Sequence, residues 1–167
     1  MLSEEVLCKM ESYISNPFGF VLFSGKQGLG KTYCALRVYE KLASYKLPFY
    51  DHDEAWFISQ SDLNILWNKN MATLGHAYEI VEDIFRTKLL IIDDLGTRVP
   101  SESFMDFLYS IVDKRYAARD HKGTIITTNL SSEKIRERFG DSFLSRMASG
   151  LIYQFSGKDR RFTEKGL

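Results

Sequence analysis

The stretch Gly25-Lys-Gln-Gly-Leu-Gly-Lys31-Thr32 decides how this chain folds. It fits the pattern G-x-x-x-x-G-K-[ST], in which a glycine-rich loop turns its backbone N–H groups toward phosphate oxygens. The glycines permit positive φ and a close approach of the backbone to an anion. Within this pattern Lys31 supplies a mobile positive charge for the outer phosphates, and the Thr32 hydroxyl is placed to ligate Mg²⁺. The stretch therefore predicts a phosphate-binding loop.

The segments on either side of the loop favour the same interpretation. An apolar run from Phe18 to Ser24 precedes it and is typical of a buried parallel strand. The residues from Tyr33 to Ser44 follow it and are rich in helix formers, with apolar side chains at helical spacing. A glycine-rich turn that fits the pattern by chance is the competing interpretation, and this strand-loop-helix context disfavours it.

The composition limits the classes of protein that the chain can represent. It has 167 residues, of which 44% are hydrophobic and 26% are charged, as expected of a globular protein with a proper core. Lys+Arg and Asp+Glu both number 22, so the molecule as a whole is not a polycation. Any contact with nucleic acid must come from a local patch or from several copies side by side.

The sequence also indicates a cellular location. Cys8 and Cys34 lie far apart without the spacing of a zinc site, which favours two reduced thiols of an intracellular protein. No apolar run approaches the roughly 18 residues of a membrane span. The acidic start, Met1 to Glu5, argues against a signal peptide. We expect a cytoplasmic protein with no membrane contact.

Hydrophobic periodicity predicts helices and strands that alternate along the chain. Apolar runs typical of strands lie at residues 18–24, 55–58, 89–92, 123–128 and 150–155. Helical spacing covers residues 3–15, 33–45, 59–71, 76–86, 101–119 and 131–147, the last broken at Gly140. The alternation indicates the α/β class with a mainly parallel sheet. We expect a single domain over 1–167, composed of an N-terminal helix (1–17), a core (18–155) and a polar, frayed tail (156–167).

A pair of carboxylates follows one of the predicted core strands. In Leu89-Leu-Ile-Ile-Asp93-Asp94-Leu-Gly96, four aliphatic residues precede the two aspartates, which places charge where ligands bind in open α/β sheets. We assign Asp93 to holding Mg²⁺ and Asp94 to orienting the water that attacks the γ-phosphate. The competing interpretation is a solvated Asp-Asp turn at the end of the strand, which the phosphate loop disfavours.

Three more residues are candidates for acting on the phosphates. Asn129 ends the next core strand, where its amide can lie between Asp94 and the γ-phosphate; alternatively it is a turn or helix-capping residue. Arg146, on a predicted surface helix, is either solvated or an arginine finger for a neighbouring subunit's nucleotide. Arg161, with Arg160 beside it, either reaches a phosphate in the same subunit or is a solvated tail residue.

The order of these motifs resembles the AAA+ ATPases of the DnaC/IstB type, which are bacterial replicative-helicase loaders and related transposition ATPases. The resemblance extends from about Phe18 to Arg161. It is carried by the phosphate loop, by the strings Leu89-Leu-Ile-Ile-Asp-Asp-Leu-Gly and Thr124-Ile-Ile-Thr-Thr-Asn-Leu-Ser, by Ser145-Arg-Met, and by Gly157-Lys-Asp-Arg-Arg. The two long strings are more specific than the loop, which many unrelated NTPases share.

The resemblance implies a fold and a set of site residues. The fold would be a P-loop AAA+ core, with a central parallel five-stranded sheet between helices, the phosphate-loop strand near its middle and no C-terminal lid domain. ATP or ADP with Mg²⁺ would be bound by Lys31 and Thr32 of the Walker A motif and by Asp93 and Asp94 of the Walker B motif. Asn129 would be sensor 1, Arg146 the arginine finger and Arg161 the sensor 2 arginine. The implied nucleotide-binding residues are Gln27, Gly28, Leu29, Gly30, Lys31, Thr32, Tyr33 and Arg161, with Thr32 and Asp93 at the metal.

In this family a helical element between the second and third strands faces a central pore and contacts single-stranded DNA. Here it would fall within 59–86, with Lys69, Asn70, His76 and Arg86 as candidates, although the region lacks a strong basic bias. Family members also carry an N-terminal domain that grips the helicase, for which the 17 residues before the first strand leave no room. The adenine pocket is expected near Asn16 to Phe18.

The functional prediction is an ATPase of the DNA-replication helicase-loader type. It would self-associate through shared nucleotide sites, engage single-stranded DNA and a replicative helicase or transposase-like partner, and hydrolyse ATP slowly until assembled. The alternative is a nucleotide-gated adaptor of a transposition or phage replication system with negligible turnover. A small P-loop kinase is a third possibility, disfavoured because no arginine-rich lid lies between Thr32 and Asp93.

Overall fold

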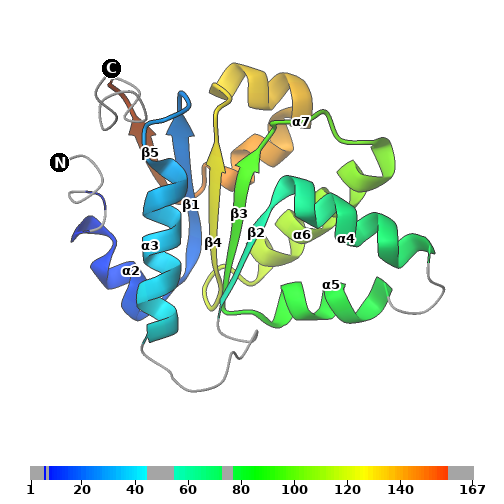
Figure 1. The fold of residues 1–167 in the computed structure, drawn as a ribbon, viewed down its shortest axis with the longest axis horizontal. Coiled ribbons are helices and arrows are strands. Elements are labelled where there is room, and N and C mark those ends of the chain that lie inside the picture. Colours follow the sequence, from blue (N-terminus) through cyan, green and yellow to red (C-terminus); the bar gives the residue numbers. More distant parts are fainter. Residues whose placement is uncertain (1–5, 7, 45–54, 73–76, 158–167) are drawn as a thin grey trace, which may run out of the picture.

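The computed structural model describes residue 6 and residues 8–44, 55–72 and 77–157. In this part of the chain five strands form one parallel sheet in the order β2-β3-β4-β1-β5 (Figure 1). The strands are β1 (Gly19–Gly25), β2 (Ala55–Ser59), β3 (Leu89–Leu95), β4 (Gly123–Thr128) and β5 (Leu151–Phe155). Strand β1, which leads into the phosphate loop, lies beside the central strand β4, as predicted.

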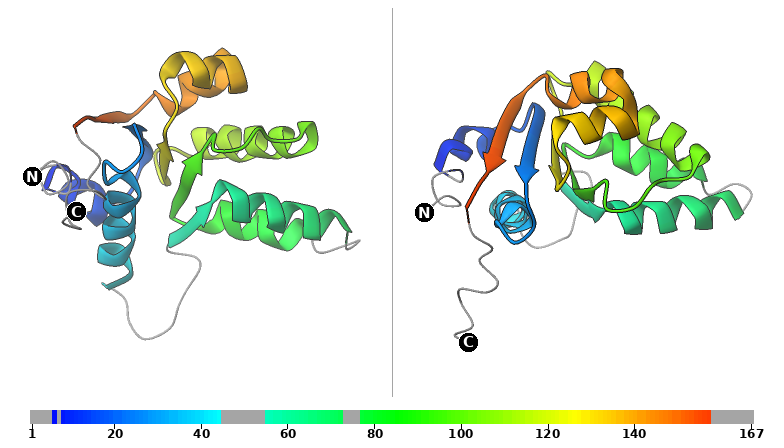
Figure 2. Two further views of the ribbon diagram at one scale, coloured as in Figure 1. Left: turned by 45° about the horizontal axis from the view of Figure 1, so that its top comes forward. Right: turned by 90° about the horizontal axis from the view of Figure 1, so that it is seen from above.

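Helices cover both faces of the sheet, which gives three layers (Figure 2). Helices α2 (Glu11–Ser15) and α3 (Lys31–Ser44) lie on one face. The other face carries α4 (Gln60–Ala72), α5 (Ala77–Arg86), α6 (Glu102–Ala117) and α7 (Ser132–Met147). Among the described residues no element follows β5. None of the described helices is long and apolar enough to cross a membrane.

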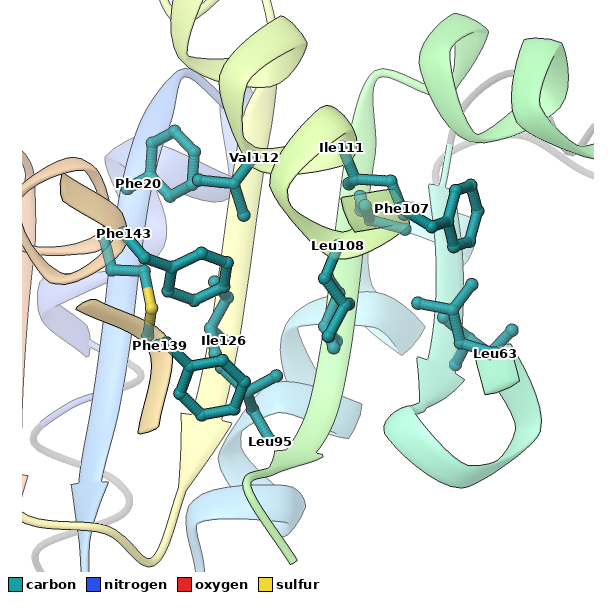
Figure 3. Packing of buried hydrophobic residues seen from close by; sticks show 14 of the residues in the cluster. Phe20, Leu63, Leu95, Phe107, Leu108, Ile111, Val112, Ile126, Phe139 and Phe143 are labelled. Carbon is teal, nitrogen blue, oxygen red and sulfur yellow. The ribbon is translucent and has the colours of Figure 1, made fainter. Parts of the chain in front are cut away.

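The alternation of side chains along the buried strands divides the core into two clusters. Successive residues of a strand point to opposite faces, so a continuous apolar run supplies both helical layers. On the α3 side the cluster contains Val21, Phe23, Leu89, Ile91 and Ile125. On the opposite side Phe20, Leu22, Leu90, Ile92 and Ile126 meet the apolar faces of α4 to α7, including Leu108, Ile111, Phe139 and Phe143 (Figure 3).

The element boundaries agree with the sequence pattern except near the functional loops. Helix α3 begins at Lys31 rather than at Tyr33, so the end of the phosphate loop is already helical. Strand β3 continues to Leu95, beyond the predicted end at Ile92, because pairing with β4 resumes after both aspartates. The predicted break in α7 is present, since Gly140 has φ 80° and ψ 165°. Residues 1–5 and 7, and the tail from 158, lie outside the described residues.

A buried arginine holds the amino-terminal edge of the sheet together. Arg115 on α6 is 1% exposed, and its guanidinium donates hydrogen bonds to the Thr124 hydroxyl (2.7 Å) and to the carbonyls of Ile84 (3.0 Å) and Thr87 (3.1 Å). It also donates to the Lys88 carbonyl (3.3 Å) and the Gly123 carbonyl. Burial lowers the pKa of Arg115 to about 10, which leaves it cationic at neutral pH. This cation therefore ties the end of α5 to the start of β4, at the edge opposite the phosphate loop.

Candidate nucleotide site

The phosphate loop joins β1 to α3 at the carboxyl end of the sheet. Its glycines have positive φ, at 141° for Gly25, 73° for Gly28 and 91° for Gly30. A Cβ on Gly25 would lie 2.3 Å from the carbonyl oxygen of Phe155, so the loop also lies directly against the end of β5. The first turn of α3 follows directly, and the positive end of the helix dipole there favours an anion. A loop of this form at a helix N-terminus suits a phosphate group.

Lys31 connects the loop to the end of β4. Its side chain is 5% exposed, and Nζ donates hydrogen bonds to the carbonyl of Lys26 (2.6 Å) and to Oδ1 of Asn129 (2.7 Å). The amide of Asn129 in turn donates through Nδ2 to Oδ1 of Asp94 (3.0 Å). The structure therefore brings together three side chains that the sequence pattern named separately, over separations of up to 98 positions.

Asp93 and Thr32 form the second part of the site. Oδ2 of Asp93 accepts a hydrogen bond from the Thr32 hydroxyl (3.2 Å), and the Asp93 side chain is largely buried. These two neighbouring oxygens are metal ligands of the hard type that Mg²⁺ prefers. In the described ranges no group of three His, Cys, Asp or Glu residues gathers that could hold a metal alone. The donor set therefore fits Mg²⁺, which usually takes one or two protein ligands together with waters and substrate phosphates.

A β-bulge in β3 orients the side chain of Asp94. Ile92 pairs with Ile126 and Leu95 pairs with Thr128, so Asp93 and Asp94 together face the single residue Thr127. Asp94 has φ 60°, and among the described residues it is the one residue other than glycine with positive φ. The bulge turns the Asp94 side chain toward Asn129. Bulges that redirect a side chain in this way occur next to active sites.

Two buried polar residues support this end of β3, and neither is predicted as a site residue from the sequence. Gln60, directly after β2, accepts a hydrogen bond from the Gly96 N–H (2.6 Å) and donates one to the Arg98 carbonyl (3.1 Å). The Thr127 hydroxyl contacts both aspartates. The sequence signal available in each case is a polar residue at the carboxyl end of a buried strand. The hydrogen-bond partners, however, lie 33 to 38 positions away.

The other loop residues that the resemblance assigns to nucleotide binding lie in different environments. Gln27 and Tyr33 are exposed, with Tyr33 at 55%. Gly28 is half-buried, whereas the Leu29 side chain is buried in the α3-side core. Leu29 can therefore meet a phosphate through its backbone N–H and not through its side chain.

Arg146 is not brought to this cluster. Its Nε lies 2.9 Å from Oδ1 of Asp113, and its guanidinium lies 5.9 Å from the centre of the Tyr116 ring. Tyr116 contacts Phe20, the second residue of β1, whereas the phosphate loop follows the last residue of that strand. Arg146 is therefore near the amino-terminal edge of the sheet, outside the reach of its own loop. Arg160 and Arg161 lie outside the described residues.

The expected adenine pocket is not supported. Asn16 to Phe18 precede β1, and a seven-residue strand, about 23 Å long, separates them from the phosphate loop. The Gly19 N–H at this end bonds to the Arg119 and Lys122 carbonyls, which fixes the segment at the amino-terminal edge. The reason for the difference is that sequence proximity to the loop strand does not indicate which end of the strand a residue occupies.

The candidates for DNA contact are spread over α4 and α5. Lys69 is exposed near the end of α4, and Arg86 ends α5 with its guanidinium 3.9 Å from Glu82. Asn70 belongs to α4, but its side chain is outside the described part of the structure, as is all of His76.

Comparison with known proteins identifies the fold. The sequence model of the family described as IstB-like ATP binding protein matches residues 8–152. A comparison with curated protein sequences found no match. The DnaC helicase loader is similar in structure, with a TM-score of 0.77 and 22% identity over 93% of this chain and 91% of that chain. The structure of DnaI is similar with a TM-score of 0.69 and 16% identity, over 92% of this chain and 84% of that chain. The structure of the replication initiator DnaA bound to AMPPCP and single-stranded DNA is similar with a TM-score of 0.77 and 16% identity, over 94% of this chain and 46% of that chain. The predicted P-loop AAA+ fold is thus confirmed.

Proposed function

Because the chain belongs to the IstB-like ATP binding protein family, we propose that it binds ATP together with Mg²⁺ and hydrolyses it at a site shared between subunits. The observation that carries this proposal is the contact network at the phosphate loop. Lys31 contacts Asn129, Asn129 contacts Asp94, and Thr32 contacts Asp93. These are the residue types that phosphoryl transfer needs, gathered around a loop of backbone N–H groups.

Each residue then has a distinct role. Lys31 and the loop N–H groups bind the outer phosphates, and Thr32 and Asp93 hold Mg²⁺. When bound there, Mg²⁺ would neutralise charge on the phosphate oxygens. Asp94 orients the attacking water and accepts its proton, while Asn129 fixes the direction of the Asp94 carboxylate through the 3.0 Å hydrogen bond. Water is thereby held in line with the γ-phosphate.

Arg146 completes the site of a neighbouring subunit in this proposal. Its own phosphate loop is at the opposite edge of the sheet, so a role in catalysis requires a second copy of the chain. An arginine supplied in this way stabilises the charge of the transition state and typically contributes about 10³-fold or more to turnover. Isolated subunits should therefore bind ATP but hydrolyse it slowly.

The assembled protein would act on DNA and on a replication or transposition partner. Support comes from the likeness in fold to a helicase loader and to an initiator bound to single-stranded DNA. We propose that α4 and α5 present Lys69 and Arg86 to the DNA, because both carry exposed cationic side chains on neighbouring helices. The partner would be a replicative helicase or a transposase-like protein.

One observation favours the nucleotide-gated adaptor as a second candidate. Oδ1 of Asp94 already accepts the Asn129 amide, which uses part of the capacity of this carboxylate to accept a hydrogen bond from a water. A site arranged in this way can sense the γ-phosphate without rapid hydrolysis. Turnover measured with and without single-stranded DNA separates the two functions, because the ATPase should be stimulated and the adaptor should not.

Calorimetric titration with ATP tests the binding proposal. We expect Lys31→Ala to abolish ATP binding, because the cation that faces the outer phosphates is lost. Arg37→Ala is the matched control, since it removes the same charge from the exposed side of the same helix, where Arg37 contacts Glu40 (2.8 Å). Equal ATP affinity in the Lys31→Ala and wild-type proteins would refute the proposed site.

A further inference from the structure

The hydroxyl of Thr127 contacts two consecutive acidic residues at once. Oγ1 lies 2.6 Å from Oδ1 of Asp93 and 2.9 Å from the backbone nitrogen of Asp94. The side chain is completely buried at the end of β4. The backbone N–H of Asp94 can only donate, so the hydroxyl accepts from it and must direct its own proton at the Asp93 carboxylate. The position of that proton is therefore determined by the geometry.

The bulge in β3 explains why this hydroxyl is needed. Asp93 and Asp94 together face one residue of β4, so the Asp94 N–H does not belong to the regular ladder. The Thr127 hydroxyl supplies the acceptor in place of a β4 carbonyl. Since a buried N–H without a partner is costly, the side chain at position 127 decides whether the bulge is stable.

The same hydroxyl fixes the orientation of the Asp93 carboxylate. Oδ1 is held by Thr127 and Oδ2 faces Thr32, so the two oxygens have different tasks. A hydrogen bond to one oxygen of a metal-binding carboxylate limits rotation of the group. Without that bond, the oxygen that faces Thr32 would no longer be held in place.

We propose that Thr127 is a positioning residue for Mg²⁺ at this site, acting through Asp93 and through the bulge at Asp94. This inference rests on the proposed function, because it assigns Asp93 to the metal. It predicts that the Thr127 hydroxyl sets the Mg²⁺ dependence of ATP binding and leaves binding without Mg²⁺ unaffected. Thr127 itself touches neither nucleotide nor metal in this account.

The next residue provides a matched control. Thr128 is also fully buried at the end of β4, and its hydroxyl donates to the Leu95 carbonyl (2.7 Å) and accepts from the Leu130 N–H (3.1 Å). Both threonines thus stabilise the end of β3, but the bonds of Thr128 go to backbone groups. Thr128→Val should lower stability while the Mg²⁺ dependence stays as in wild type.

The experiment measures ATP affinity by calorimetry over a series of Mg²⁺ concentrations and in EDTA, together with thermal unfolding. Thr127→Val should raise the Mg²⁺ concentration for half-maximal effect by about tenfold or more, the usual cost of losing a partner of a metal ligand. Thr127→Ser, which keeps the hydroxyl, should restore the wild-type value. If the valine variant does not fold, Thr127→Cys, which lacks the methyl group but keeps a weaker S–H donor, should show a smaller shift in the same direction.

Two negative outcomes are distinguishable. A Thr127→Val protein with the wild-type Mg²⁺ dependence, or a Thr128→Val protein with the same shift as Thr127→Val, would overturn the role of Thr127 and leave the proposed function standing. A wild-type protein that binds ATP equally well in Mg²⁺ and in EDTA would overturn the assignment of Asp93 to the metal, and the inference with it.

Discussion

Replacement of Arg115 by methionine tests how the amino-terminal edge of the sheet is held. Methionine keeps the apolar stem but removes every N–H donor from a fully buried position. The carbonyls of Ile84 and Thr87 lie in the last turn of α5 and just beyond it, where helical carbonyls have no partner of their own. The variant leaves both of these carbonyls without the guanidinium.

The size of the effect follows from these two carbonyls. A buried acceptor that loses its donor costs about 1–3 kcal/mol, and relief of the buried charge offsets a part, so we expect the free energy of unfolding to fall by about 3 kcal/mol. Globular domains have about 5–15 kcal/mol in total, so the variant should unfold at a clearly lower denaturant concentration. Arg115→Lys should recover part of the loss, because an ammonium group still donates.

Urea unfolding followed by circular dichroism measures the change. Lys122→Met is the control, since Lys122 donates to the Phe85 and Arg86 carbonyls at the same helix end but is partly exposed, so water can replace it. That control should lose no more than about 1 kcal/mol. ATP affinity of folded Arg115→Met should match wild type, because Arg115 is remote from the phosphate loop. A loss below about 1 kcal/mol for Arg115→Met would show that the guanidinium does not hold this edge of the sheet.

Two further substitutions test contacts near the phosphate loop. Gly25 has φ 141°, and Gly25→Ala would place a Cβ 2.3 Å from the Phe155 carbonyl oxygen. The loop must then move, so ATP affinity should fall by about tenfold or more. Gly157→Ala is the control: this residue has φ 127° but no atom within 4 Å of the added Cβ, so ATP affinity should stay near wild type. Gln60→Leu leaves the Gly96 N–H and the Arg98 carbonyl without their partner, so urea unfolding should show a loss of about 1–3 kcal/mol, and an unchanged midpoint would contradict that role.

The features that are local in sequence could be predicted. The phosphate loop, the apolar runs and the helical spacing each depend on neighbouring residues, and they determine the α/β class and the alternation of elements. Gly140 predicted the break in α7 because glycine adopts φ 80° without strain. The two aspartates could be assigned to the carboxyl edge because they follow four aliphatic residues.

The features that depend on strand register could not be predicted. The bulge at Asp94 arises from pairing with β4, and aspartate gives no local signal for φ 60°. The buried side chain of Arg115 looks like an exposed charge in a helical pattern, because two of its acceptors, the carbonyls of Ile84 and Thr87, are 31 and 28 positions away. The adenine expectation at Asn16 to Phe18 is not supported for the same reason, since only the fold shows which end of β1 these residues occupy.

The shared nucleotide site can be tested directly with two inactive variants mixed in equal amounts. Lys31→Ala keeps Arg146 but should not bind ATP, and Arg146→Ala should bind ATP but lack the arginine for its neighbour. Random head-to-tail pairing makes about one interface in four productive. The mixture should hydrolyse ATP clearly faster than the sum of the separate proteins. Turnover equal to that sum, with both variants still able to co-assemble with wild type, would contradict a shared nucleotide site.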